Sequence, residues 1–216
     1  MRLLKPIFES SLWKDSCFEG VLKMIKFIGI INDDYCMEYE HIPKDAILID
    51  EEKVDKFGFT AGVIGVIFGF LVLLWKQYIC NEGVFPLKRN MIIIGCIIGV
   101  IMFGIHEVLH LLPYPKDANR CIAINQGKPI SFCNAPITKT KFIVSSFLPI
   151  LLGVIPILLF MVLPNSYQVL NTILWASGTI GLGAAGNDYV ETLIIAVKVP
   201  GKMKIISGKE GFYYYK

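Results

Sequence analysis

The pentapeptide HEVLH, at positions 106–110, combines residue types and a spacing that suit metal-dependent hydrolysis. On a helix, His106 and His110 lie four residues apart and therefore on one face, within reach of a single metal ion. Glu107 points toward the neighbouring face, where its carboxylate can take a proton from water. Zinc held in this way polarises a carbonyl group and lowers the pKa of its water to roughly 7. The motif therefore predicts Zn²⁺ as the cofactor and hydrolysis of an amide bond as the reaction.

The surroundings of this motif are apolar, because it ends the run from Met91 to Leu112. Ionisable side chains inside a membrane segment are costly and usually serve function. A purely structural role would require a separate buried partner for each of the three ionisable groups. We therefore expect His106 and His110 to bind the metal and Glu107 to act as the catalytic base.

A third metal ligand should come from another apolar segment. Two acidic residues qualify, Asp188 and Glu191 in the stretch GLGAAGNDYVETLIIAV. At ~1.5 Å per residue, Asp188 and the two histidines lie roughly 22 to 28 Å along their helices from the outer side, hence in one layer. Small residues just before Asp188 would allow close approach of a neighbouring helix. Glu191 remains the competing carboxylate, and Asn187 is a candidate hydrogen-bond donor to a developing oxyanion.

The composition indicates which kind of structure positions these residues. Of 216 residues, 54% are apolar and 18% are charged, and the mean hydropathy is +0.58, which is typical of a membrane protein. The net charge of +3 comes from scattered residues, so no nucleic-acid surface is expected. We predict an all-α membrane protein with about four transmembrane helices and small cytoplasmic β-hairpin elements. The predicted helices cover approximately residues 57–78, 91–112, 142–163 and 169–190.

The distribution of lysine and arginine predicts the orientation in the cell membrane. If the N-terminus is inside, 18 of the 21 basic residues lie on the cytoplasmic side. The positive-inside rule then favours a multi-pass protein with both termini in the cytoplasm. This topology divides the chain into a cytoplasmic arm (1–56), a membrane-embedded metallopeptidase domain (57–199) and a cytoplasmic tail (200–216).

Three polar stretches predict smaller elements. RCIAINQGKPISF and MKIISGKEGFYYY each alternate around turn residues, as β-hairpins do. FEGVLKMIKFIGI has an amphipathic helical pattern, with Phe18, Leu22, Ile25 and Ile28 on one face. Such a helix would lie on the membrane surface or pack against the rest of the protein.

The order of these segments resembles a bacterial family of small multipass membrane proteins described as zincin peptidases. The resemblance covers approximately residues 57–212, and its specific parts are HEVLH and AAGNDYVETL, which begins at Ala184. It implies that His106, His110 and Asp188 bind zinc and that Glu107 is the base. The chain is more distantly similar to site-2 intramembrane metalloproteases, although it lacks their Asn-x-x-Pro-x-x-x-Leu-Asp-Gly setting.

Three functional interpretations follow. The first is a membrane-embedded zinc metallopeptidase that cleaves a peptide or membrane-protein substrate near the cytoplasmic face. The second is a metal-binding scaffold without catalysis, which would hold zinc but show no turnover. The third is a small transporter that uses intramembrane His and Asp as cation sites. It would require repeats with broken helices in both halves, and the sequence shows none. The first interpretation accounts best for the complete motif.

Overall fold

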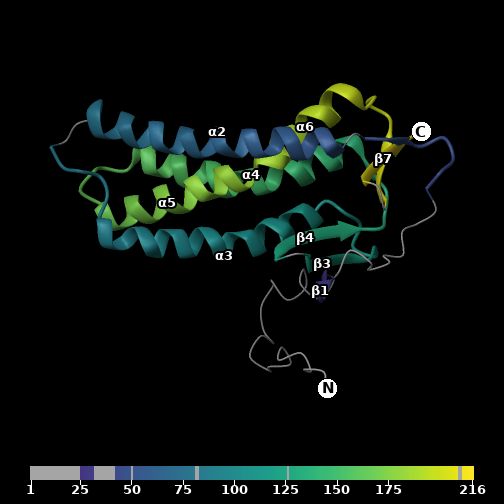
Figure 1. Ribbon diagram of the computed structural model, residues 1–216, viewed down its shortest axis with the longest axis horizontal. Coiled ribbons are helices and arrows are strands. Elements are labelled where there is room, and N and C mark those ends of the chain that lie inside the picture. The colour runs from purple at the N-terminus through teal and green to yellow at the C-terminus, as the bar shows by residue number, and fades with distance from the viewer. Residues whose placement is uncertain (1–24, 32–41, 50, 81–82, 126, 209–210) are drawn as a thin grey trace, which may run out of the picture.

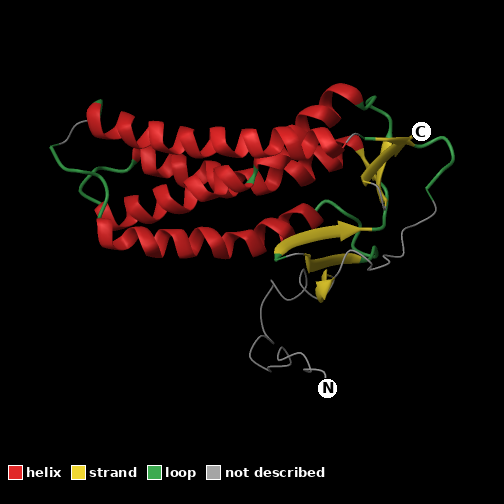
Figure 2. Ribbon diagram, in the orientation of Figure 1, coloured by secondary structure: helices red, strands yellow, loops and turns green. Residues whose placement is uncertain are grey.

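A computed structural model describes residues 25–31, 42–49, 51–80, 83–125, 127–208 and 211–216. Long helices form a bundle, and two small sheets cover one end of it (Figures 1 and 2). The helices are α2 (Glu51–Tyr78), α3 (Ile92–Leu111), α4 (Lys139–Val162), α5 (Gln168–Ala184) and α6 (Gly186–Lys198), and a short 3₁₀ helix η1 (Arg89–Met91) precedes α3. The structure is therefore mainly helical, with the small sheets that the sequence predicts.

Three helical segments are long and apolar enough to cross a membrane: Val54–Tyr78, Arg89–Leu111 and Lys139–Val162. Their outer surfaces carry large apolar side chains, such as Phe59 with 77% and Ile93 with 69% of the side chain exposed. Exposed apolar surface on this scale is what lipid contact requires. These helices are consistent with a membrane protein.

The predicted fourth helix, 169–190, differs from the structure. The segment divides into α5 and α6, which meet at an angle of 47° and together form at most one further span. Ala185 leaves the helical conformation between them, with φ −76° and ψ 12°. The prediction of one continuous helix was therefore wrong. The break could not be recognised in the sequence, because the run of apolar and small residues continues without interruption through Ala185 and Gly186. The break is important for the site because Asp188 follows it directly.

Glycines allow α2 to pack closely against α5 and α6. A Cβ atom added at Gly62 would lie 2.5 Å from the Gly183 carbonyl oxygen, and one added at Gly65 would lie 2.6 Å from that of Leu182. Such distances leave no room for a side chain, so these helices meet backbone to backbone. The close approach expected for the small residues before Asp188 is confirmed: Gly183 and Gly186 meet α2, and Gly181 meets Gly153 of α4.

One sheet has the strand order β1-β3-β4. Strands β3 (Arg120–Asn125) and β4 (Lys128–Cys133) form the hairpin predicted from the sequence, with Gly127 at φ 78° in the turn. Strand β1 (Ile25–Ile31) pairs with β3 in parallel. The amphipathic helix predicted here is therefore wrong over the described residues, and Phe18 and Leu22 lie outside them. Isoleucine-rich stretches suit either element, and pairing with β3 decides in favour of a strand.

The second sheet has the order β2-β7-β6-β5. Strands β6 (Lys204–Gly208) and β7 (Gly211–Tyr215) form the other predicted hairpin, to which the two-residue strands β2 (Ile47–Leu48) and β5 (Ile137–Thr138) add. A cluster of buried apolar residues, including Leu111, Phe142 and Ile205, joins this sheet to the helix ends. The two sheets therefore close the end of the bundle that carries the motif.

Candidate metal centre

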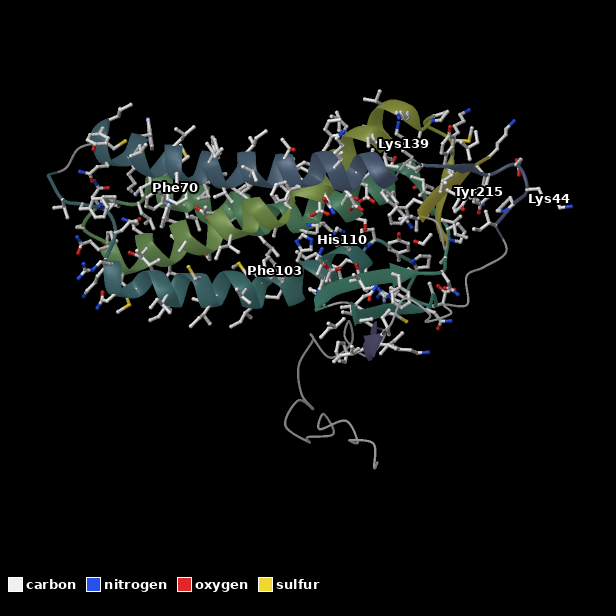
Figure 3. All side chains as sticks on the ribbon, in the orientation of Figure 1. Lys44, Phe70, Phe103, His110, Lys139 and Tyr215 are labelled. Atoms are coloured by element: carbon white, nitrogen blue, oxygen red, sulfur yellow. The ribbon has the colours of Figure 1, made fainter. Side chains whose placement is uncertain are left out.

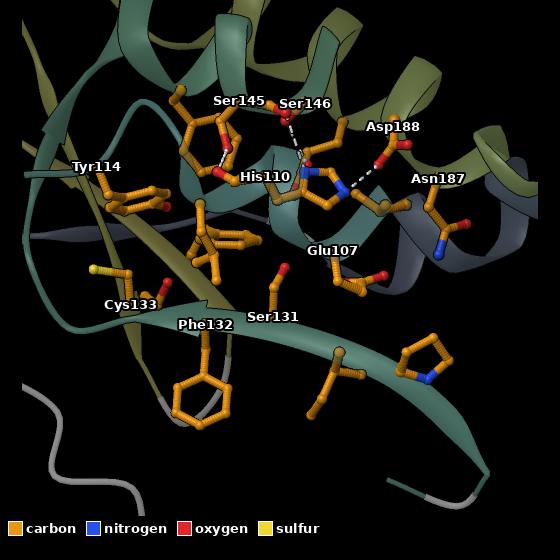
Figure 4. A pocket seen from close by; sticks show the side chains of 18 of the residues that line it. Glu107, His110, Tyr114, Ser131, Phe132, Cys133, Ser145, Ser146, Asn187 and Asp188 are labelled. Atoms are coloured by element: carbon orange, nitrogen blue, oxygen red, sulfur yellow. Dashed lines mark hydrogen bonds and ion pairs between the residues drawn. The ribbon is translucent and has the colours of Figure 1, made fainter. Parts of the chain in front are cut away.

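Helix α3 places both motif histidines on one face. The Nε2 atoms of His106 and His110 lie 3.1 Å apart, and the ring centroids are 4.8 Å apart. The other ring nitrogen of His110, Nδ1, lies 3.1 Å from the Ser145 carbonyl oxygen on α4. A carbonyl oxygen only accepts hydrogen bonds, so Nδ1 carries the proton and Nε2 presents its lone pair. Figures 3 and 4 show His110 within the bundle, facing the start of α6.

Helix α6 supplies the third group of the cluster. Asp188 lies in the first turn of α6, and the break after α5 directs this turn toward α3. Its Oδ2 is 3.3 Å from Nε2 of His106, and its Oδ1 is 3.3 Å from Nε2 of His110. The residue is only 6% exposed, and Oδ2 has no hydrogen-bond partner among the described residues. A buried carboxylate oxygen in this condition needs a cation or a proton.

These distances fit a single zinc ion. The three groups each offer one ligand atom, and the atoms all lie within 4.8 Å of one another. Tetrahedral zinc with bonds of about 2.0–2.1 Å separates its ligand atoms by roughly 3.3 Å, close to the observed spacing. Two histidine nitrogens and one carboxylate oxygen are also common zinc ligands. The residues present could therefore hold one zinc ion with three protein ligands.

Glu107 does not join the cluster and faces the adjoining pocket. The pocket has a volume of about 320 Å³ and is lined by Glu107, His110 and Asp188 together with residues of β4. Both the backbone N–H and the hydroxyl of Ser131 on β4 hydrogen-bond to Glu107. Figure 4 shows Ser131 beside Glu107, with His110 and Asp188 above them. This arrangement leaves Glu107 close to the cluster and orients its carboxylate.

Asn187 and Glu191 lie on either side of Asp188 in the sequence but take different positions. The Asn187 side chain donates to Oδ1 of Asp55 on α2 at 3.4 Å, and its amide lines the pocket. Glu191 accepts a hydrogen bond of 2.8 Å from the Ser146 hydroxyl on α4. Of the two carboxylates left open by the sequence, Asp188 is the one placed among the histidines.

Four contributing residues were missed by the sequence analysis: Asp55, Ser131, Ser145 and Ser146. The paired serines in the apolar stretch FIVSSFLP were a usable signal, since hydroxyls in a membrane helix face other helices. Asp55 belongs to a polar helix start, and Ser131 to a short strand, where such residues are common. Only the tertiary structure connects these two with the site.

A second cavity, of about 760 Å³, lies beside the pocket between α2 and the junction of α5 and α6. It shares Asp55 and Asn187 with the pocket and otherwise has mainly apolar and glycine lining, with Lys128 of β4 near one end. The metal site is therefore adjacent to a groove along the apolar helices.

Comparison with known proteins matches part of the chain to a protein family. Residues 99–202 match the model of a family described as "putative zincin peptidase". The matched range includes HEVLH, the β3–β4 hairpin and Asp188. The resemblance expected from the sequence is confirmed for this range. No curated protein and no solved structure matches the chain.

Proposed function

We propose that this chain, with its zincin-peptidase segment, is a membrane-embedded zinc metallopeptidase that hydrolyses peptide bonds near the cytoplasmic face. The convergence of His106, His110 and Asp188 beside Glu107 in one pocket carries the proposal. A non-catalytic zinc site is normally closed by a fourth protein ligand, whereas three ligands next to a pocket and a carboxylate suit catalysis.

The division of labour follows from the contacts. Zinc, when bound, supplies a Lewis acid that polarises the substrate carbonyl and acidifies water. His106, His110 and Asp188 would hold it, and the Ser145 carbonyl keeps the His110 ring in the tautomer that can bind a metal. Glu107 takes the proton from the attacking water and passes it to the leaving amine. Ser131 orients the Glu107 carboxylate for both transfers.

The substrate binds in this proposal as an added strand. Among the described residues β4 pairs only with β3, so no strand occupies its other edge, where the Ser131 N–H meets Glu107, and residues 129–133 line the pocket. An extended peptide hydrogen-bonded to that edge would pass Glu107 and the metal ligands. The adjoining groove along α2 offers a route for a substrate within the lipid bilayer, and the positive-inside count supports the cytoplasmic placement of both termini.

Transport is less well supported. A transporter built on repeats needs matching broken helices in its two halves. In the part of the chain that the structure describes, α5 and α6 form one bent pair. Glu107 is partly buried and accepts hydrogen bonds from the hydroxyl and the backbone N–H of Ser131. It would serve as the base in hydrolysis but has no evident role in transport.

The decisive experiment compares detergent-purified wild type with Glu107→Gln and His106→Ala. Metal analysis should give about one zinc per chain for wild type and Glu107→Gln, since neither lacks a ligand, and none for His106→Ala. Cleavage of a fluorogenic peptide mixture should fall by about 10²- to 10⁴-fold in Glu107→Gln. Zinc binding without cleavage by wild type would favour the scaffold, and absence of zinc would overturn the metal centre itself.

A further inference from the structure

The metal pocket continues past His110 into a recess that the proposed chemistry does not use. Its walls come from the end of α3, from the following loop, from β4, from α4 and from β7: Leu111, Tyr114, Cys133, Phe142 and Phe212. Figure 4 shows Tyr114 and Cys133 at this end and Asp188 and Asn187 at the other, with His110 between them. The pocket therefore has a polar end at the metal site and an apolar end at the recess.

The recess walls carry no basic side chain. Phe142 and Phe212 meet edge to face, with ring centroids 4.9 Å apart, and Leu111 is 1% exposed. Burial raises the pKa of the Tyr114 phenol, so it stays neutral and bonds to Ser207. Protein interiors are normally close-packed, so a pocket of about 320 Å³ that extends between these apolar side chains is suited to an apolar guest at this end.

Strand β4 links the recess to the catalytic groups. Side chains alternate along a strand, so residues 131 and 133 point to one face and residue 132 to the other. In Figure 4 Ser131 and Cys133 point toward the pocket, and Phe132 points away from it. Ser131 contacts Glu107, and Cys133 lines the recess. The recess is therefore two residues along β4 from the catalytic base, about 6.8 Å away.

The side chains of a peptide paired with β4 would alternate between the two faces in the same way as those of β4. The peptide residue beside Ser131 lies at the metal, and the side chain two residues away, beside Cys133, enters the recess. Antiparallel pairing is the more stable arrangement. In it, the peptide residue beside Cys133 lies two residues to the amino-terminal side of the one beside Ser131.

We propose that the recess is a specificity subsite that accepts one large apolar side chain, two residues to the amino-terminal side of the residue held at the metal. The proposal deepens the peptidase function and depends on it. Burying a leucine-sized side chain in such a site releases water from both surfaces and strengthens binding. Substrates with glycine at this position should bind weakly.

Binding of tripeptide hydroxamates tests the subsite without turnover. Triglycine hydroxamate and three versions with a single leucine at the first, second or third position are titrated into zinc-loaded protein, both wild type and Glu107→Gln. The compound with leucine first should bind about 10-fold more tightly than triglycine hydroxamate, because its side chain alone reaches the recess. Equal affinity of all four, or an advantage for leucine at another position only, would overturn the subsite and leave the metal centre intact.

Two variants change the recess in opposite directions. Cys133→Phe fills it and should abolish the leucine advantage, whereas Phe212→Ala enlarges it and should shift the preference to a bulkier naphthylalanine. Ile124→Leu, on the neighbouring strand β3 and outside the pocket lining, is the control, and its profile should be that of wild type. Affinity for triglycine hydroxamate and zinc content report folding in each variant. If Cys133→Phe misfolds, an unchanged side-chain preference in Phe212→Ala still overturns the subsite. If no hydroxamate binds zinc-loaded wild type, both the subsite and the proposed function are overturned.

Discussion

Lys76 and Asp188 are both charged residues buried among apolar helices, near opposite ends of the bundle, and their surroundings differ in kind. The Lys76 ammonium, 1% exposed, donates to the carbonyl oxygens of Phe160 and Leu163 and to Oδ1 of Asn171. It also lies 4.3 Å from the centre of the Phe160 ring. Asp188 instead faces the Nε2 atoms of His106 and His110.

The difference separates a structural charge from a chemical one. Lys76 satisfies carbonyls at the C-terminal end of α4, where the helix dipole favours a cation, and it ties α2 to α4 and α5. At the other end two imidazoles and a carboxylate converge, and their buried acceptor atoms need a cation or a proton. Burial and charge alone therefore do not identify a functional site. A better indicator is a group of potential ligand atoms that converge beside a pocket.

The largest effect is expected from removing a ligand at the chemical end. Asp188→Ala should lower zinc affinity at least ~100-fold and abolish cleavage, because only two histidines remain. Metal-free Asp188→Ala should unfold at the same temperature as metal-free wild type or at a higher one, since a buried carboxylate has been removed. Metal analysis and thermal unfolding in detergent measure both quantities.

Glu191→Gln serves as the matched control, because Glu191 follows Asp188 by about one helical turn and contacts Ser146. It should keep its zinc. Full zinc occupancy in Asp188→Ala with loss in Glu191→Gln would mean that the wrong carboxylate had been identified.

Lys76→Met should show the opposite pattern. Loss of the ammonium leaves the carbonyls of Phe160 and Leu163 without this donor, at a cost of about 2 kcal/mol. The unfolding temperature should fall by about 5 °C while zinc content stays at the wild-type level. Lys88→Met, at an exposed lysine near the same end, is the control and should change neither. Loss of zinc in Lys76→Met would contradict the assignment of a purely structural role to Lys76.

Ser131→Ala tests the orientation of the base with a smaller effect. Zinc should remain bound, and turnover should fall by about 10-fold, because the carboxylate of Glu107 keeps the backbone hydrogen bond but loses the hydroxyl. Ser131→Thr retains a hydroxyl and should recover most of the activity. Steady-state kinetics on the peptide mixture provide the measurement, and equal rates for all three proteins would remove Ser131 from the mechanism.

The final prediction concerns which end of the helix bundle faces the cytoplasm. In a background without other cysteines, Cys80, which follows α2 at the Lys76 end, should react with an impermeant maleimide on intact cells. A cysteine introduced at the exposed Lys202, beyond α6, should react only after the cells are opened. The reverse labelling pattern would place the metal site near the outer face.

The sequence alone was sufficient wherever a local pattern has one structural outcome. Long uncharged runs predict helices because lipid leaves the backbone no other way to satisfy its hydrogen bonds. The β3–β4 and β6–β7 hairpins follow from alternation around turn residues. The spacing of His106 and His110 places both on one face of any helix, which predicts two of the three groups of the cluster without a structure.

Tertiary structure decided everything that depends on contacts between segments far apart in the chain. Ile25–Ile31 has a pattern that suits a helix or a strand, and pairing with β3 selects the strand. The break at Ala185, absent from the hydropathy, turns α6 so that Asp188 rather than Glu191 meets the histidines. Ser131 reaches Glu107 only because its hairpin folds back beneath α3. The physical reason is common to all three: local patterns specify how a segment folds, whereas the position of one side chain relative to another depends on packing between segments.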